Sequence, residues 1–188
     1  MKATGIVRRI DELGRIVVPK EIRRTLRINE GDPLEFFTDT DGKIMLKKYS
    51  SMNELGDFAD ACVESLAQHT GHLACIVDKD QVVAVSGGGS KKKDFYEKKT
   101  SIALVKQISQ RKVSIATRKE STYVPILESD DPNVGTYNSQ LIAPITHQSD
   151  IFGAVILLSP DKKMGEIETK LAQSTADILG KHASEGLL

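Results

Sequence analysis

Residues 8–26 read RRIDELGRIVVPKEIRRTL, and this segment carries the main structural signals of the N-terminal part of the chain. Two short runs rich in Ile and Val, GIVRRI (5–10) and RIVVP (15–19), flank DELG, which has the composition of a turn. We expect these two runs to be strands. Pro19 then precedes KEIRRTLRI (20–28), which we expect to be a short helix, because proline is tolerated in the first turn of a helix.

The rest of the first 50 residues adds two more strands but little that could form a core. Ile22 and Leu26 lie four residues apart and should form the docked side of the helix, with the arginines facing outward. LEFFT (34–38) and KIMLKK (43–48) are strand-like and are joined by Asp41-Gly42, a strong hairpin signal. Domains below roughly 40–60 residues usually need disulfides, a metal or a partner chain. We therefore expect a second copy of the segment to complete it as an obligate dimer.

Positive charge in this segment is carried almost wholly by arginine. Six of the eight arginines lie between Arg8 and Arg27, whereas residues 28–188 hold two arginines and sixteen lysines. Residues 1–50 carry 11 basic and 8 acidic side chains, against 15 and 18 in residues 51–188. Guanidinium is planar and binds phosphate or guanine through two hydrogen bonds at once, which lysine cannot do. A solvated face, with the arginines paired to nearby acidic residues, is the alternative, but it does not explain the choice of arginine.

Residues 4–37, TGIVRRIDELGRIVVPKEIRRTLRINEGDPLEFF, closely resemble the DNA-binding domain of the AbrB-type transition-state regulators. The resemblance implies a swapped-hairpin β-barrel, in which two chains interleave to make one unit that binds double-stranded DNA in AT-rich promoter regions. It also implies which residues contact the DNA. These are Arg8, Arg15, Arg23 and Arg24, with Lys2 and Arg9 as auxiliaries.

The remaining sequence alternates helical and strand patterns in the order of an α+β domain. Ser50–Asn53 is a polar break, and a helix is expected from 53 to 69, ended by Gly71. Antiparallel strand pairs are expected because no crossover helices separate the strands. The further expected elements are a hairpin of 72–78 with 81–87, a helix over 95–110, a short strand at 113–117, a hairpin of 140–146 with 151–159, and a helix over 164–182. The expected domains are 1–50, a linker or helix start at 51–55, and 56–188.

An AbrB-type head joined to a domain of this strand order resembles the stage V sporulation protein T family of spore-forming Firmicutes. The resemblance implies a transcriptional regulator, both activator and repressor, of late forespore-expressed genes, located in the cytoplasm of the forespore. It implies a C-terminal GAF-like domain, with an antiparallel sheet flanked by helices, that senses an unknown small molecule. It further implies a homotetramer, in which swapped dimers are tied together through the GAF-like domains.

Signals for catalysis or a bound cofactor are weak, and we expect no enzyme activity, no cofactor and no metal site. The four histidines lack ligand spacing, and GGGSKKK (87–93) lacks the spacing of a phosphate-binding loop. Segments 86–93 and 120–138 are candidate lids over a ligand, or plain surface loops. Cys75, Val77 and Ala143 are expected to fill core rather than line a pocket.

Two other classes of protein stay open. An antitoxin-type protein would join a DNA-binding dimer to a disordered tail that wraps a partner, which the folded pattern of residues 51–188 disfavours. A GAF-fold redox enzyme would need a reactive Cys62 or Cys75, although buried cysteines are usually inert. Two cysteines, no apolar run near the roughly 20 residues of a membrane helix, and no signal peptide fit a cytosolic protein without membrane partners.

Overall fold

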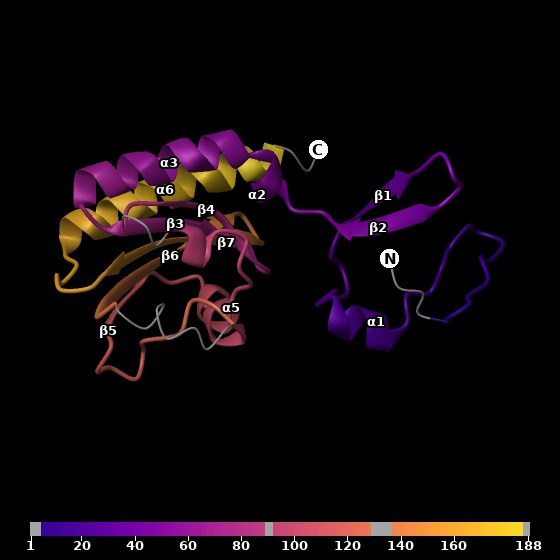
Figure 1. The fold of residues 1–188 in the computed structure, drawn as a ribbon, viewed down its shortest axis with the longest axis horizontal. Coiled ribbons are helices and arrows are strands. Elements are labelled where there is room, and N and C mark those ends of the chain that lie inside the picture. The colour runs from indigo at the N-terminus through magenta and orange to yellow at the C-terminus, as the bar shows by residue number, and fades with distance from the viewer. Residues whose placement is uncertain (1–4, 89–91, 129–136, 186–188) are drawn as a thin grey trace. The chain divides into compact units, whose positions relative to one another are not determined.

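The structure, a computed structural model, describes residues 5–88, 92–128 and 137–185. The chain divides into two compact units, Met1–Tyr49 (unit 1) and Ser50–Leu188 (unit 2). Figure 1 shows both units.

The described residues of unit 1 form one short helix and one two-stranded antiparallel sheet. The helix is α1 (Lys20–Thr25), and the sheet pairs β1 (Leu34–Thr38) with β2 (Ile44–Lys48). The hairpin expected around Asp41-Gly42 is confirmed, with Thr38 opposite Ile44. The described residues of a single unit 1 form no closed barrel, because two strands cannot close one.

The two strands expected at 5–10 and 15–19 are wrong for the single chain. Residues 5–17 are all exposed, and the two runs meet only at their turn, where the backbone N–H of Asp11 donates to the carbonyl of Arg15 at 3.1 Å. A strand needs a ladder of backbone partners, and between residues 5–10 and 15–19 no such ladder forms beyond the turn. Their sequence favours extended backbone, but local pattern does not supply the ladder that makes a strand.

Unit 2 is built on a five-stranded antiparallel sheet. Both predicted hairpins are confirmed, and β3 pairs with β7 to join them into one sheet. The strand order is β4-β3-β7-β6-β5. The strands are β3 (Leu73–Val77), β4 (Val82–Ser86), β5 (Ser114–Thr117), β6 (Ser139–His147) and β7 (Asp150–Ser159).

Helices cover both faces of this sheet, which confirms the predicted α+β class. In Figure 1, α3 (Gly56–Thr70) and α6 (Glu166–Glu185) lie side by side over one face, and α5 (Ile102–Ile108) lies on the other. Gly71 ends α3 in the left-handed conformation, with φ 69°, as the sequence predicted. Unit 2 also contains two four-residue helices, α2 (Ser51–Glu54) and α4 (Lys92–Phe95).

The helix expected over 95–110 is wrong in its first half. Phe95 ends α4, and the next residues bridge to other segments, Lys99 to Gln81 and Thr100 to Leu127. The helix restarts at Ser101, whose hydroxyl accepts a hydrogen bond from the backbone N–H of Leu104 at 2.9 Å. Tertiary bridging therefore overrides local helix propensity in this segment.

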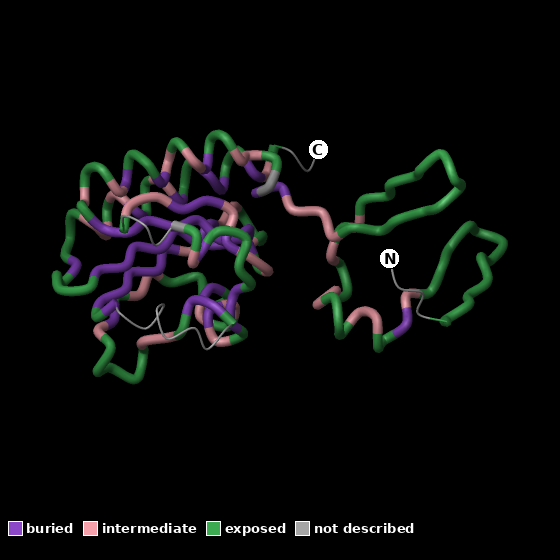
Figure 2. Tube along the Cα trace, viewed as in Figure 1, coloured by how far each residue is buried: buried purple, intermediate pink, exposed green. Residues whose placement is uncertain are grey.

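The core of unit 2 consists of two apolar layers, one on each face of the sheet, and the buried strands stand out in Figure 2. Ala143 belongs to the layer under α3 and α6, and Cys75 and Val77 belong to the layer under α5. The prediction that these three residues fill core is confirmed, since each is fully buried. On α6, Leu179 is buried whereas Ile167 is 73% exposed.

Candidate nucleic-acid interface

The arginines of the first 27 residues lie on the exposed surface of unit 1. Arg8 and Arg9 precede the 11–14 turn, Arg15 follows it, and Arg23 and Arg24 lie on α1. All are exposed except Arg23, which is half-buried. Lys2, expected as an auxiliary, lies outside the described residues.

Asp11 organises the turn between the two arginine-bearing runs. Its Oδ1 accepts the backbone N–H groups of Leu13 at 3.0 Å and Arg15 at 2.8 Å, and its Oδ2 accepts the guanidinium Nε of Arg15 at 2.7 Å. The backbone N–H of Arg15, and then its guanidinium, hold the pKa of the Asp11 carboxyl below its ordinary value. Asp11 therefore remains ionised and fixes the turn that carries Arg15.

The ion pairs within unit 1 leave most of the arginine array unneutralised. Arg15 pairs with Asp11, and both side chains are exposed. Exposed ion pairs contribute little to stability, so exchanging Asp11 for another anion at Arg15 would cost little free energy. Arg8 donates to the carbonyl of Val7 at 2.9 Å. Across the described residues, Arg9, Arg23 and Arg24 have no ion-pair partner, so the solvated-face alternative accounts for one pair rather than for the array.

Helix α1 holds two of the arginines and is fixed at its C-terminal end. Arg27 adopts the left-handed conformation, with φ 53°, and its carbonyl accepts a hydrogen bond from Nζ of Lys48 at 3.1 Å. The same Nζ lies 3.2 Å from Oδ2 of Asp32, and both side chains are largely buried. This pair ties β2 to the end of α1. The sequence analysis missed it, because residues 16 positions apart in a loop and a strand show no local pattern.

The docked side expected for α1 is not docked within the chain. Ile22 is half-buried, but Leu26 is 56% exposed. Among residues 5–49, Pro19 alone is buried. Within this described range, twelve large apolar side chains are exposed, namely Ile6, Val7, Ile10, Leu13, Ile16, Val17, Leu26, Phe36, Phe37, Ile44, Met45 and Leu46.

The two cysteines are placed for packing and not for chemistry. Cys62 packs against the layer under α3 and α6, whereas Cys75 lies in the layer on the opposite face of the sheet. Burial raises the pKa of both thiols, which disfavours the nucleophilic thiolate. The described residues contain no group of three or more His, Cys, Asp or Glu side chains arranged to hold a metal. No helix in the described part of the chain has the length and apolarity to span a membrane.

Parts of the two candidate lids, 86–93 and 120–138, fall on residues 89–91 and 129–136, outside the described residues. Their role as lids remains a prediction. The described flank of the second lid is packed, since Ile126 and Leu127 are buried in the layer under α5.

Comparisons with known proteins agree with this arrangement. Residues 54–184 match the family model described as "Stage V sporulation protein T C-terminal, transcription factor", and residues 7–54 match one described as "Antidote-toxin recognition MazE, bacterial antitoxin". The chain is 65% identical to the transition state regulatory protein AbrB of Bacillus subtilis over 49 residues, which cover 26% of this chain and 50% of AbrB.

Unit 2 resembles a solved GAF domain. The GAF domain of an Acinetobacter phosphoenolpyruvate-protein phosphotransferase superposes with a TM-score of 0.57 at 12% identity, covering 74% of this chain and 86% of that one. At this identity the likeness shows the fold alone. The chain thus has the make-up of a transcription factor in which an AbrB-like domain precedes a GAF fold.

The particular family follows from the full-length relative. The chain is 45% identical to stage V sporulation protein T of Bacillus subtilis over 185 residues, covering 98% of this chain and 100% of that protein. This chain belongs to the stage V sporulation protein T family, as its sequence predicted.

Proposed function

We propose that unit 1 pairs with unit 1 of a second chain in a swapped-hairpin barrel that binds double-stranded DNA, and that the protein regulates transcription in this way. Two observations on unit 1 support the proposal: its described residues form no apolar core, and its arginines are exposed. Pro19 is the one buried residue of 5–49, so a second copy is needed to cover the apolar surface. The pairing doubles each arginine about a two-fold axis.

The proposed DNA contacts are Arg8, Arg15, Arg23 and Arg24, with Arg9 and Lys2 as auxiliaries. The arginines of the turn and of α1 belong to two separate structural elements, each fixed by its own hydrogen bonds. Guanidiniums suit phosphate contacts, which position a protein on the duplex, and they also suit narrow minor grooves in AT-rich DNA. We therefore propose AT-rich promoter regions as targets.

We further propose that unit 2 joins two such dimers into a tetramer. Three large apolar side chains are exposed on its paired helices, Phe58 on α3 with Ile167 and Ile178 on α6. Phe58 packs edge-on against His182 with ring centroids 5.1 Å apart, which links the two helices. Contact between these helices of two chains would cover that apolar surface. The domain limits that fit this division are 1–50, 51–55 and 56–188.

The biological role that fits the family is regulation of late, forespore-expressed genes in the cytoplasm of the forespore, by activation of some and repression of others. The identity of 45% over the whole of a stage V sporulation protein T supports this role. Unit 2 would sense a small molecule and catalyse no reaction. The raised pKa values of both thiols support the absence of redox catalysis.

The proposal is tested by fluorescence-anisotropy titration of an AT-rich duplex across a salt series. A dimer that uses two to four arginines per chain contacts about 4–8 phosphates, so log K against log salt should slope by about −4 to −7. Arg23→Ala/Arg24→Ala should weaken binding and make the slope about 2–4 shallower, because up to four contacts are lost per dimer. Arg23→Lys/Arg24→Lys should keep most of the slope but lose affinity, since lysine keeps charge without bidentate geometry.

Lys106→Ala/Lys112→Ala is the matched control, because it removes two exposed positive charges from unit 2. It should leave affinity and slope nearly unchanged. Weak binding with a flat slope in the wild type would refute the assignment to unit 1. So would a loss of affinity in Lys106→Ala/Lys112→Ala as large as the loss in Arg23→Ala/Arg24→Ala.

A second candidate function is suggested by the match of residues 7–54 to the MazE antitoxin family model. An antitoxin-type protein would bind a protein partner through its C-terminal part. The folded core of unit 2 disfavours a tail of the wrapping kind. Capture of a defined toxin by the full chain, with no DNA binding, would establish this alternative.

A further inference from the structure

Arg15 differs from three other arginines of unit 1 in having a carboxylate held against its guanidinium. Its Nε donates to Oδ2 of Asp11 at 2.7 Å. Arg9, Arg23 and Arg24 have no ion-pair partner in the part of the chain that the structure describes. The Arg15–Asp11 pair is neutral as a whole, so it attracts a phosphate less strongly than an unpaired arginine does. The two kinds of arginine therefore suit different contacts with DNA.

Asp11 is held in the turn independently of the Arg15 side chain. Its Oδ1 accepts the backbone N–H groups of Leu13 at 3.0 Å and of Arg15 at 2.8 Å. These two bonds keep the carboxylate in place even when the guanidinium moves. A phosphate at Arg15 would therefore lie beside a second negative charge, and like-charge repulsion disfavours that arrangement. The neutral edge of a base meets no such repulsion.

The guanidinium of Arg15 keeps two parallel donors available. Among the described residues, Nη1 and Nη2 of Arg15 donate no hydrogen bond, and the side chain is 71% exposed. The bond from Nε restricts the orientation of the guanidinium plane, which lowers the conformational entropy lost when the Nη1–Nη2 edge binds two acceptors. On a base pair, O6 and N7 of guanine are the adjacent acceptors that a guanidinium binds at once.

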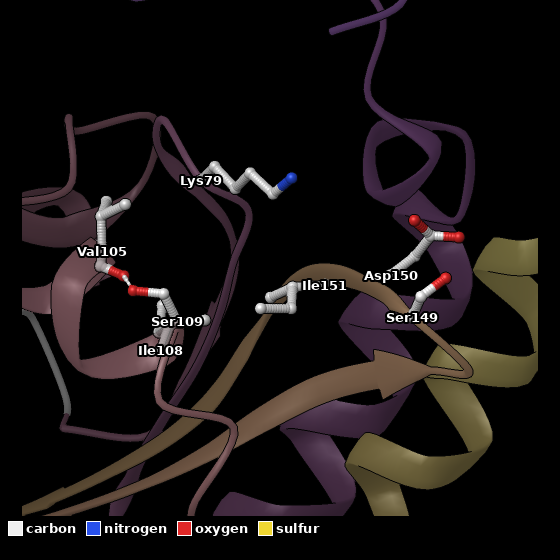
Figure 3. Close-up of a pocket in the computed structure, with 7 residues that line it drawn as sticks. All are labelled: Lys79, Val105, Ile108, Ser109, Ser149, Asp150 and Ile151. Carbon is white, nitrogen blue, oxygen red and sulfur yellow. Dashed lines mark hydrogen bonds between the residues drawn. The ribbon is translucent and has the colours of Figure 1, made fainter. Parts of the chain in front are cut away.

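A lysine in unit 2 shows what an unrestrained donor looks like. A hollow of about 270 Å³ lies between the β3–β4 turn, α5 and the β6–β7 turn (Figure 3). Lys79 extends its ammonium over the apolar floor, whereas the carboxylate of Asp150 points away from it. Within the described residues, no hydrogen bond or ion pair holds this ammonium. The hollow thus offers one movable donor, whereas the turn at 11–15 offers an oriented pair.

We propose that Arg15, positioned by Asp11, binds guanine in the major groove, whereas Arg23 and Arg24 contact phosphates. Nη1 and Nη2 donate to O6 and N7 of guanine, and Nε stays on Asp11. Asp11 is a positioning residue, because it acts on DNA through Arg15. In a dimer, two copies of Arg15 bind two guanines related by the two-fold axis. The inference rests on the proposed DNA-binding function, for which it names the base that one arginine recognises.

A second turn of unit 1 has the same hydrogen bonds but carries lysine. Oδ1 of Asp39 accepts the backbone N–H groups of Asp41 at 3.1 Å and Lys43 at 2.8 Å, and its Oδ2 accepts Nζ of Lys43 at 3.2 Å. Lysine has no planar pair of donors, so it cannot bind a base edge as a guanidinium does. Asp39→Asn is therefore the matched control for Asp11→Asn, because both remove one charge from the same kind of turn.

The test is sequencing of the duplexes that the full chain selects from a pool with a randomised centre. Wild type should enrich G·C pairs at two positions related by two-fold symmetry. Asp11→Asn and Arg15→Ala should each lose this preference, whereas Asp39→Asn should keep it. Asparagine retains one oxygen for the backbone N–H groups of the turn and replaces the oxygen that accepts from Nε by an amide nitrogen. Asp11→Asn thus removes the link to Arg15 and keeps the turn.

Replacement of the enriched guanines by 7-deazaguanine removes the N7 acceptor and keeps the base pairing. It should weaken binding by wild type and by Asp39→Asn at least about fivefold, the lower end for a bidentate base contact. Binding by Asp11→Asn and Arg15→Ala should be nearly unchanged by the replacement, since neither variant makes the contact.

A salt series on a duplex of A·T pairs alone separates positioning from damage to the fold. On this DNA, Asp11→Asn should bind at least as tightly as wild type. Its slope of log K against log salt should be about 1–2 steeper, because each dimer gains two unopposed guanidiniums that can contact phosphate. A variant whose turn is merely disrupted would bind more weakly and with a shallower slope.

Three outcomes would overturn the proposal and leave arginine-dependent DNA binding in place. They are no guanine preference in wild type, a preference that Asp11→Asn or Arg15→Ala keeps, and a preference that Asp39→Asn loses as fully as Asp11→Asn does. Absence of salt-dependent binding to any duplex would instead refute the proposed function itself.

Discussion

Unit 1 and unit 2 differ in whether a single chain can complete them. Unit 2 buries two continuous apolar layers on either side of a five-stranded sheet. Unit 1 buries Pro19 alone among residues 5–49 and leaves Phe36 70% exposed and Val17 71% exposed. Both units contain short runs rich in Ile and Val that the sequence predicts to be strands. Local sequence pattern therefore specifies extended backbone, whereas the strand that pairs with it can belong to another molecule.

The two units also differ in charge. Residues 1–50 have a net charge of +3 and residues 51–188 a net charge of −3, so the neutral whole chain hides two oppositely charged halves. A positively charged unit without its own core fits a polyanion-binding dimer, and a negatively charged self-contained unit does not.

The largest effect is expected from Gly153→Ala in β7. A methyl group at Gly153 would lie 1.8 Å from the carbonyl oxygen of Val77, which is backbone of the neighbouring strand and cannot move aside. The free energy of unfolding of unit 2 should fall by roughly 3 kcal/mol or more, measured by denaturant unfolding. Gly165→Ala is the matched control, since the nearest atom there is a carboxylate oxygen of Glu168 at 3.5 Å. Equal stability of the two variants would contradict the packing described for unit 2.

A smaller effect is expected from Phe36→Ala in unit 1. If a second copy covers this side chain, the change removes about 1.5–3 kcal/mol of burial per side chain. The dissociation constant of the dimer formed by residues 1–53 should rise at least about tenfold, measured by sedimentation equilibrium. Glu35→Ala, an exposed neighbour in β1, should leave it nearly unchanged. An unchanged dissociation constant for Phe36→Ala would show that this face stays in water.

The smallest effect is expected from the pH dependence of His72. Burial lowers the pKa of His72, and the nearby carboxylate of Glu168, 3.8 Å from its ring, opposes this only partly. The unfolded chain therefore binds the proton more readily than the folded one. The contribution of neutral His72 to the free energy of unfolding is complete above about pH 6.5, the ordinary pKa of histidine. It is lost as the pH falls through the lower pKa of His72 in the folded state.

Thermal unfolding of wild type and His72→Gln between pH 7.5 and 5 checks this. The stability of wild type should decrease more than that of His72→Gln over this range, and the exposed His69→Gln should behave as wild type does. A difference between wild type and His72→Gln that does not change with pH would contradict the assigned cause.

Most of unit 2 was predictable from its sequence. The hairpins of β3 with β4 and of β6 with β7 were predicted because alternating or continuous Ile and Val runs are bounded by turn residues. Residues 96–101 were not, because their bridges to Gln81 and Leu127 depend on chain segments far from them in sequence. The extent of α6 was also predicted, although small residues such as Ala172 and Ala176 make its buried contacts.

The candidate sites divide in the same way. The arginines were predictable, since their number and clustering are properties of one short stretch. The role of Asp11 was missed, because its hydrogen bonds appear only when the turn is folded.

The central claim, that unit 1 is completed by a second copy and unit 2 is not, is tested most directly on the two parts made separately. Far-UV circular dichroism and sedimentation equilibrium of residues 1–53 and 50–188 should be measured over a range of concentrations. For residues 1–53, we predict folded dimers that lose secondary structure in the same concentration range in which they dissociate. For residues 50–188, secondary structure should persist at every concentration. A folded monomer of residues 1–53 would contradict the account.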